Sequence, residues 1–165
     1  MTIDQLIEKG FSQELVYNPE APLEGVLSYK EVFKEDDVVD KFKAFLEKEG
    51  CEILSSCSTK QKGIDIVAKA KCGVNLIVEA KGTQGKKDPR AAMGVAFQGA
   101  VGEVLQRGHL AELNTLNIIA LPFNDYYLKK VASVNALQNF KIGLVFALIP
   151  VNGDPVYMYG GPKIN

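Results

Sequence analysis

The sequence is poor in the residues that bind transition metals or form disulfides. Its 165 residues include one histidine, His109, and three cysteines, Cys51, Cys57 and Cys72, with no C-x-x-C spacing. An odd number of cysteines and a single histidine supply neither a disulfide framework nor a Cys/His zinc site. We therefore interpret the cysteines as reduced, buried thiols and assign no role to His109.

Long apolar runs are missing as well. No window approaches the roughly 18 apolar residues of a membrane span. The N-terminal segment MTIDQLIEKG contains Asp and Glu and has no apolar stretch of signal-peptide length. We therefore expect a cytoplasmic protein that does not enter a membrane.

Neither sign of charge dominates, but the charges are unevenly distributed. The 19 Lys and Arg residues nearly balance the 20 Asp and Glu residues, and a net charge of −1 argues against a protein that coats nucleic acid. Residues 1–52 hold 13 acids and 6 bases, whereas residues 60–90 hold eight bases and three acids. A lysine-rich stretch is usually a solvated surface. The positions of the three acids within this stretch make it a candidate site.

The composition predicts one globular domain. The chain is 47% apolar and 24% charged, and at this length a domain buries roughly 70% of the surface that its unfolded chain exposes. We expect residues 1–30 to form an N-terminal extension, with a helix at residues 2–9 followed by a loop. This extension would cover a sheet edge or build a homodimer. Residues 31–165 would form the domain itself.

Hydrophobic periodicity predicts an α/β fold in which a mixed sheet lies between helices. The first core helix has Asp36 or Asp37 as its N-cap and ends at Gly50. Further helices are expected at residues 91–107 and from Asn124 to about residue 138. Strands are expected at residues 51–57, 64–70, 74–80, 115–121, 142–149 and 156–159.

Two neighbouring strands each carry an acid among apolar residues. Because side chains alternate between the faces of a strand, Glu79 and Lys81 share the face opposite Val78 and Ala80. If Asp65 lies on that face at the same end of the sheet, two carboxylates converge, which is costly unless a cation lies between them. Oxygen ligands without His or Cys favour Mg²⁺ or Mn²⁺. The pattern leaves open that these groups are solvated, ion-paired strand ends.

The segments GIDIVA (residues 63–68) and LIVEAKG (residues 76–82) together resemble the signature of the PD-(D/E)XK nuclease superfamily. The core of that superfamily, called the restriction-endonuclease-like fold, has the order αβββαβ, which matches the order expected for residues 36–121. Ile64 stands where the superfamily motif has proline. The resemblance implies a metal-dependent DNA endonuclease, a phosphodiester hydrolase.

The resemblance also implies roles for individual residues. Asp65, Glu79 and the backbone carbonyl of Ala80 would hold one Mg²⁺ or Mn²⁺. Lys81 would contact the attacking water and a phosphate oxygen, either stabilising a hydroxide as an ammonium or, with a depressed pKa, helping to remove the proton. Gln98 in the second core helix would orient water or phosphate.

Members of the superfamily often offer a further acid to the metal from the first helix. Asp40 is the nearest match by spacing, with Asp37 and Glu35 as alternatives, although Glu is commoner than Asp in the superfamily.

Basic residues flank the motif on both sides and would form a surface that follows the DNA phosphates, or else an ordinary solvated loop. These residues are Lys60, Lys62, Lys86, Lys87 and Arg90.

Two other functions are compatible with the sequence. One is a non-catalytic nuclease-like domain that binds nucleic acid or a protein partner through the same fold. The other is an α/β domain with no role on nucleic acid, which would bind DNA weakly or not at all.

Overall fold

The computed structural model describes residues 32–58, 62–83, 87–107, 112, 114–133, 143–151 and 157–159. The helix expected at residues 2–9 and the extension of residues 1–30 lie outside this part of the chain. His109 lies outside it as well.

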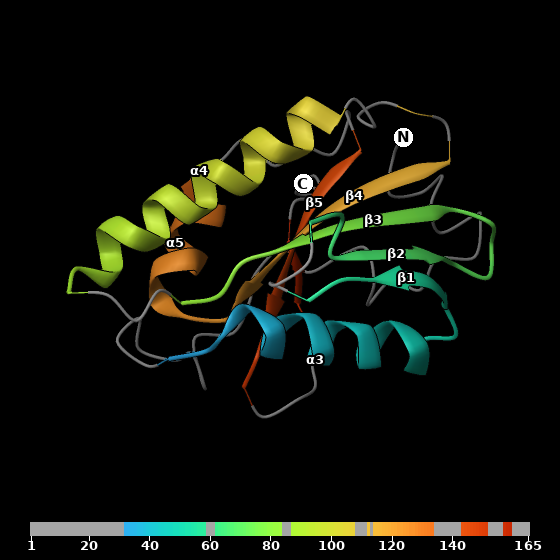
Figure 1. Cartoon of the computed structure of the whole chain (residues 1–165), viewed down its shortest axis with the longest axis horizontal. Coiled ribbons are helices and arrows are strands. Elements are labelled where there is room, and N and C mark those ends of the chain that lie inside the picture. The colour runs from blue at the N-terminus through green and yellow to red at the C-terminus, as the bar shows by residue number, and fades with distance from the viewer. Residues whose placement is uncertain are drawn as a thin grey trace, which may run out of the picture.

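The described elements form one mixed sheet with helices on both faces (Figure 1). In chain order they are α3 (Glu35–Lys48), β1 (Glu52–Ser56), β2 (Ile66–Lys69), β3 (Asn75–Ala80), α4 (Pro89–Arg107), β4 (Thr115–Pro122), α5 (Asp125–Ser133), β5 (Leu144–Ile149) and β6 (Tyr157–Tyr159). The strands lie side by side in the order β1-β2-β3-β4-β5-β6.

Strand directions match the order of the connections. β1, β2 and β3 form an antiparallel meander, β3, β4 and β5 run parallel, and β6 pairs antiparallel with β5. The parallel pairs are joined through α4 and α5, as parallel strands require. The mixed sheet and the αβββαβ order from α3 to β4 confirm the predicted fold class.

Alternation along the strands separates two hydrophobic clusters, one on each face of the sheet. On one face, Leu76 and Val78 of β3 pack in a cluster with Phe42 of α3. On the other face, Phe146 of β5 packs in a cluster with Phe97 of α4, and the two rings stack with their centroids 5.7 Å apart. α3 therefore covers one face, and α4 and α5 cover the other, as Figure 1 shows.

The N-termini of α3 and α5 differ in how they are capped. α3 begins at Glu35, so that Lys34 and not Asp36 or Asp37 is the N-cap, and Lys34 makes no side-chain cap hydrogen bond. The acids of the first turn instead interact favourably with the helix dipole. Asn124 does cap α5, because its Oδ1 accepts a hydrogen bond from the Tyr127 backbone N–H at 2.8 Å.

The cysteines are free, but they are not equally buried. Cys51 is buried, whereas Cys57 and Cys72 are only partly buried. The expectation of three buried thiols is therefore wrong for two of them. Cys72 lies in the tight turn between β2 and β3, and Cys57 follows the end of β1, where connecting segments reach the surface.

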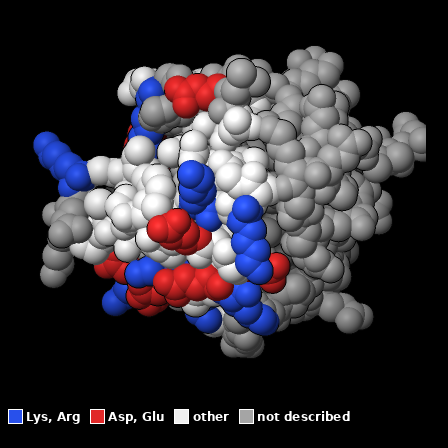
Figure 2. All heavy atoms as spheres, turned by 90° about the vertical axis from the view of Figure 1, so that its right-hand side faces the viewer, with Lys and Arg blue, Asp and Glu red and all other residues white. Residues whose placement is uncertain are grey.

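Charges of both signs mix on the surface seen from the β2–β3 turn side. Figure 2 shows acidic and basic side chains next to one another on this face, with no broad area of one sign among the described residues. Such mixing is typical of a solvated surface and does not indicate a nucleic-acid interface on this side. Within the described ranges, no helix combines the length and the apolar composition needed to cross a membrane.

A close backbone contact fixes the chain just before α3 against the end of β3. The Thr83 backbone N–H donates to the Phe33 carbonyl at 2.8 Å, and the Phe33 N–H donates to Thr83 Oγ1 at 2.5 Å. A Cβ atom on Gly82 would lie 2.5 Å from the Glu35 backbone nitrogen and 2.6 Å from the Phe33 carbonyl oxygen. From α5, the Tyr127 hydroxyl donates to the Gly82 carbonyl at 2.9 Å. Glycine at position 82 therefore lets the first turn of α3 lie beside the end of β3.

We expect Gly82→Ala to lower the free energy of unfolding by about 1–3 kcal/mol, because the added methyl group forces two rigid backbone segments apart. Urea denaturation followed by circular dichroism measures this change. Gly102→Ala is the control, since its Cβ would meet nothing within 4 Å and alanine is favoured over glycine in a helix by about 1 kcal/mol. Equal unfolding midpoints for Gly82→Ala and the wild type would contradict the packing described here.

Candidate active site

Asp65, Glu79 and Lys81 lie together on the sheet face that α4 covers. The β2–β3 register pairs Ile66 with Val78, and continuing it by one residue puts Asp65 opposite Glu79. Both carboxylates are buried, with exposed fractions of 8% for Asp65 and 3% for Glu79. Lys81 Nζ lies 2.6 Å from Glu79 Oε1. The structure thus brings these three sequence-predicted residues into one cluster.

Asp65 is held by the backbone of the neighbouring strand. Its Oδ2 accepts a hydrogen bond from the Ala80 N–H at 2.7 Å. Burial raises the pKa of Asp65, and the negative charge of Glu79 raises it further, against the opposing effects of the Ala80 hydrogen bond and of Lys81. Asp65 is therefore a carboxylate whose charge the fold only partly compensates.

Glu79 is the best compensated acid of the cluster. Burial acts to raise its pKa, but the neighbouring Glu103 carboxyl, the Lys81 ammonium and the Arg107 guanidinium together outweigh burial, so the pKa of Glu79 is lowered. Arg107 Nη2 lies 2.7 Å from Glu79 Oε2. The pKa of Glu103 is raised by partial burial and by the neighbouring carboxylate of Glu79. The pair carries its negative charge mainly on Glu79.

Lys81 is a charged ammonium in this arrangement. Burial acts to lower its pKa, but the hydrogen bond and the charge of Glu79 prevail and the pKa of Lys81 is raised. Its Nζ also lies 3.5 Å from Glu103 Oε1. Of the two roles that the sequence left open, this environment favours the ammonium that stabilises negative charge over the neutral amine that removes a proton.

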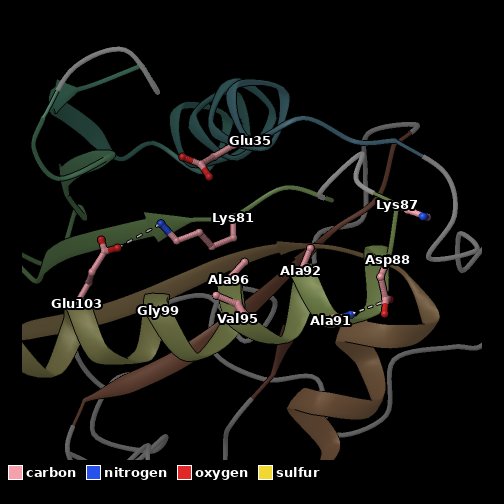
Figure 3. Close-up of a pocket in the computed structure, with 10 residues that line it drawn as sticks. All are labelled: Glu35, Lys81, Lys87, Asp88, Ala91, Ala92, Val95, Ala96, Gly99 and Glu103. Carbon is pink, nitrogen blue, oxygen red and sulfur yellow. Dashed lines mark hydrogen bonds and ion pairs between the residues drawn. The ribbon is translucent and has the colours of Figure 1, made fainter.

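The cluster opens into a groove of about 620 Å³ between α4, the start of α3 and the end of β3 (Figure 3). Lys81 and Glu103 point toward each other across one end of the groove, and Glu35 faces them from the α3 side. Small side chains of α4 form the floor, and Val95 among them is 70% exposed. The lining residues are Glu35, Lys81, Lys87, Asp88, Ala91, Ala92, Val95, Ala96, Gly99 and Glu103.

The first-helix acid at this site is Glu35 and not Asp40. Glu35 is half-buried, and its pKa is raised first by burial and then by the negative charges of Asp65 and Glu79, while Lys81 lowers it. Asp40 is exposed. The two acids are five positions apart, which is about 140° around a helix of 3.6 residues per turn, so they cannot face the same site.

The prediction for Gln98 is wrong for the same reason as the prediction for Asp40, because Gln98 lies on another side of its helix. It is exposed on α4 and does not line the groove. Glu103 takes its place, again five positions along and therefore about 140° around the helix. The buried face of α4, formed by Met93, Phe97, Ala100 and Val104, sets this rotation.

The basic residues near the motif are divided between described and undescribed parts of the chain. Lys62, Lys87 and Arg90 are exposed, and Lys87 lines the groove. Lys60 and Lys86 lie outside the described residues.

Glu103 and Arg107 were not predicted as site residues, although the sequence contains a signal for them. They are the only charged residues in the segment 91–107, and they are spaced i, i+4. An acid and a base at this spacing lie on the same side of a helix, and Arg107 Nη2 lies 3.4 Å from Glu103 Oε2. A charged pair in an otherwise apolar helix indicates a polar site on that side.

The donor atoms of the cluster fit a hard divalent cation. Glu79 Oε2 is buried and has no hydrogen-bond partner in spite of the nearby Arg107, because the guanidinium is not oriented to donate to it. Asp65 supplies a second buried carboxylate on the same face. Across the described ranges, no three His, Cys, Asp or Glu side chains are grouped closely enough to form a complete metal site. Two carboxylates with water completing the shell is an arrangement that Mg²⁺ accepts.

Comparison with known proteins identifies likenesses at the level of fold. No family model and no curated protein sequence matches this chain. A solved XisH family protein from Nostoc punctiforme is 16% identical and superposes with a TM-score of 0.50, over 75% of this chain and 98% of its own. A FdxN element excision controlling factor protein from Anabaena variabilis is also 16% identical, with a TM-score of 0.44 over 76% of this chain and 99% of its own. The first likeness shows a shared mixed α/β fold.

We expect Asp65→Asn to stabilise the metal-free protein at pH 7. The folded-state pKa of Asp65 is raised above its ordinary value of 3.8, so the folded state binds this proton more tightly than the unfolded state. The contribution of Asp65 to the free energy of unfolding is therefore favourable at low pH, and it is lost as pH rises from 3.8 through the folded-state pKa. Asparagine does not ionise, and its Oδ1 can still accept the Ala80 N–H.

Urea midpoints in EDTA at pH 7 and near pH 3 test this expectation. The gain from Asp65→Asn should be present at pH 7 and absent at the acidic pH. Asp40→Asn removes an exposed acid from α3 and should change neither midpoint appreciably. A loss of stability in Asp65→Asn at pH 7 would mean that Lys81 and Arg107 compensate Asp65 fully.

Proposed function

We propose that this protein is a metal-dependent endodeoxyribonuclease of the PD-(D/E)XK type, which hydrolyses phosphodiester bonds in DNA. The observation that carries the proposal is the meeting of Asp65, Glu79 and Lys81 on one sheet face at the end of an open groove. The αβββαβ order around them and the fold shared with an XisH family protein support it.

Asp65 and Glu79 are the proposed ligands of one Mg²⁺ or Mn²⁺, with the backbone carbonyl of Ala80 as a third. The chemistry that such an ion supplies is activation of a water molecule and neutralisation of the charge that develops on the phosphoryl group. Glu35, which faces the same groove from α3, is the proposed additional acid in place of Asp40.

Lys81 would stabilise the negative charge that develops on the reacting phosphate. Lys81 lines the groove, and its ammonium is held in position by ion pairs with Glu79 and Glu103. Because it is held in a partly buried site, its charge is worth more there than in bulk water. Lys81 is therefore proposed to contact a phosphate oxygen and the attacking oxygen, and to remain protonated as it does so.

DNA binding is proposed to be local, because the whole chain carries a net charge of only −1. Lys87 lines the groove. Lys62 and Arg90 are exposed and flank the Asp65 and Glu79 segments in the sequence. Together with Lys60 and Lys86 they would contact phosphates and position the duplex without reading its sequence. A cytoplasmic location and a homodimer that cuts both strands belong to the same proposal.

A non-catalytic nuclease-like domain is the second candidate, and one observation favours it. Lys81 and Arg107 already compensate the charge of Glu79 without a metal ion. Such a domain would bind nucleic acid or a protein partner. Metal ions would then leave the melting temperature unchanged.

Cleavage of supercoiled plasmid DNA tests the catalytic proposal. We expect nicking or cutting that requires Mg²⁺ or Mn²⁺ and falls by about 10²- to 10³-fold or more in Asp65→Ala and Lys81→Ala, since each removes a group that stabilises the transition state. Glu35→Gln should lower the rate less, and Asp40→Asn, an exposed acid on the same helix, should leave it unchanged. Metal-dependent cleavage that persists in Asp65→Ala would point to a contaminating nuclease.

Fluorescence anisotropy with a labelled duplex tests the phosphate contacts separately from cleavage. In the Asp65→Asn background, we expect Lys87→Ala to weaken DNA binding at all sequences and to reduce the slope of log affinity against log salt by about 1. Lys129→Ala removes an exposed lysine from α5, away from the groove, and should leave the slope unchanged. Equal slopes for the two variants would remove Lys87 from the interface.

A further inference from the structure

Arg107 has no counterpart in the nuclease motif, yet its guanidinium touches the acid at the centre of the site. Nη2 lies 2.7 Å from Glu79 Oε2 and 3.4 Å from Glu103 Oε2. The Arg107 side chain is 21% exposed, so much of its charge is removed from water. This residue reaches Glu79 from the last turn of α4, while Lys81 reaches it from the residue directly after β3.

The contact between Arg107 and Glu79 is close but poorly aligned. Although Nη2 and Oε2 are within ion-pair distance, Oε2 is buried without a hydrogen bond, and so is Arg107 Nη1. A buried carboxylate oxygen without a hydrogen bond has an unused lone pair. Arg107 therefore supplies charge to Glu79 without satisfying the oxygen that a metal ion would use.

The two carboxylate oxygens of Glu79 differ in how well they bind the neighbouring cationic side chains. Oε1 accepts a hydrogen bond from Lys81 at 2.6 Å, which is the distance of a strong charge-assisted bond. Oε2 lies 2.7 Å from Arg107 Nη2 and accepts no hydrogen bond from it. An entering cation would therefore take Oε2 and displace Arg107, leaving the Lys81 contact in place.

From this geometry we infer that Arg107 is a built-in competitor of the divalent cation at Glu79 Oε2 and sets how tightly the free protein binds metal. This inference rests on the proposed function, because it concerns the same carboxylates. It assigns to Arg107 a positioning role: it holds Glu79 in the metal-free protein and must leave Oε2 when a metal ion binds. Glu103, four residues earlier on α4, remains as its partner after displacement.

Isothermal titration calorimetry of the full chain with Mn²⁺ tests the inference without DNA and without measuring activity. We expect Arg107→Gln to bind Mn²⁺ about tenfold more tightly than the wild type, because a single charge within 4–6 Å changes the affinity of a carboxylate for a proton by about 10- to 1000-fold. Arg107→Lys should lie between them, since it keeps the charge on a side chain with a different shape and reach. Lys129→Gln, which removes one exposed positive charge from α5, should match the wild type.

Two further variants locate the affinity gain and guard against misfolding. Asp65→Asn combined with Arg107→Gln should lose the gain, because it removes the second carboxylate of the same site. If Arg107→Gln does not fold in the absence of metal, its recovery by added Mn²⁺ but not by added NaCl of equal ionic strength supports the inference. Recovery by neither overturns it, since Arg107 is then needed for the fold even when a divalent ion is present.

The outcomes separate the inference from the proposed function. Mn²⁺ binding that requires Asp65 but is equal or weaker in Arg107→Gln overturns the competition and leaves the nuclease proposal standing. Binding by Arg107→Gln alone supports the competition and shows that the wild-type chain excludes the metal, which overturns the nuclease proposal. Binding by neither protein overturns both.

Discussion

The site depends on one buried negative charge, the carboxylate of Glu79. With an exposed fraction of 3%, this group has lost nearly all contact with water, and an uncompensated ion in such a position costs several kcal/mol. Lys81, directly after β3, and Arg107, at the end of α4, offset that cost from two sides. The same charge therefore holds the polar end of α4 against the sheet, and Glu103 contacts both Lys81 and Arg107.

A second constraint brings α3 to this cluster. The hydrogen bonds between Phe33 and Thr83 join the chain before α3 to the chain after β3, across 50 residues of sequence. Gly82 leaves room for this approach, and Tyr127 holds the Gly82 carbonyl from α5. Because Glu35 is the first residue of α3, the backbone contact places its carboxylate at the groove. The groove thus lies between α4, the start of α3 and the end of β3, which are tied together by backbone hydrogen bonds and buried charge.

Much of the fold could be predicted because its signals are local. The apolar runs of β4 and β5, buried at every position, are typical of strands covered on both faces, and the alternation in β3 correctly puts Glu79 and Lys81 on one face. The helix residues of the site were harder to predict from the sequence. Asp40 and Gln98 each stand five positions from the residue that faces the groove, Glu35 and Glu103, because helical periodicity gives relative positions around an axis but not the direction of the site.

Strand alternation and hydrophobic periodicity act over a few residues, so local patterns were enough to predict the order of the elements and the common face of Glu79 and Lys81. Which helix residues lie beside Glu79 and Lys81 depends instead on tertiary packing. The rotation of α4 follows from how Met93 and Phe97 pack on the sheet, and the start of α3 follows from the backbone approach at Gly82. Those contacts join residues far apart in the chain, and their geometry depends on the whole packed core and not on any local pattern.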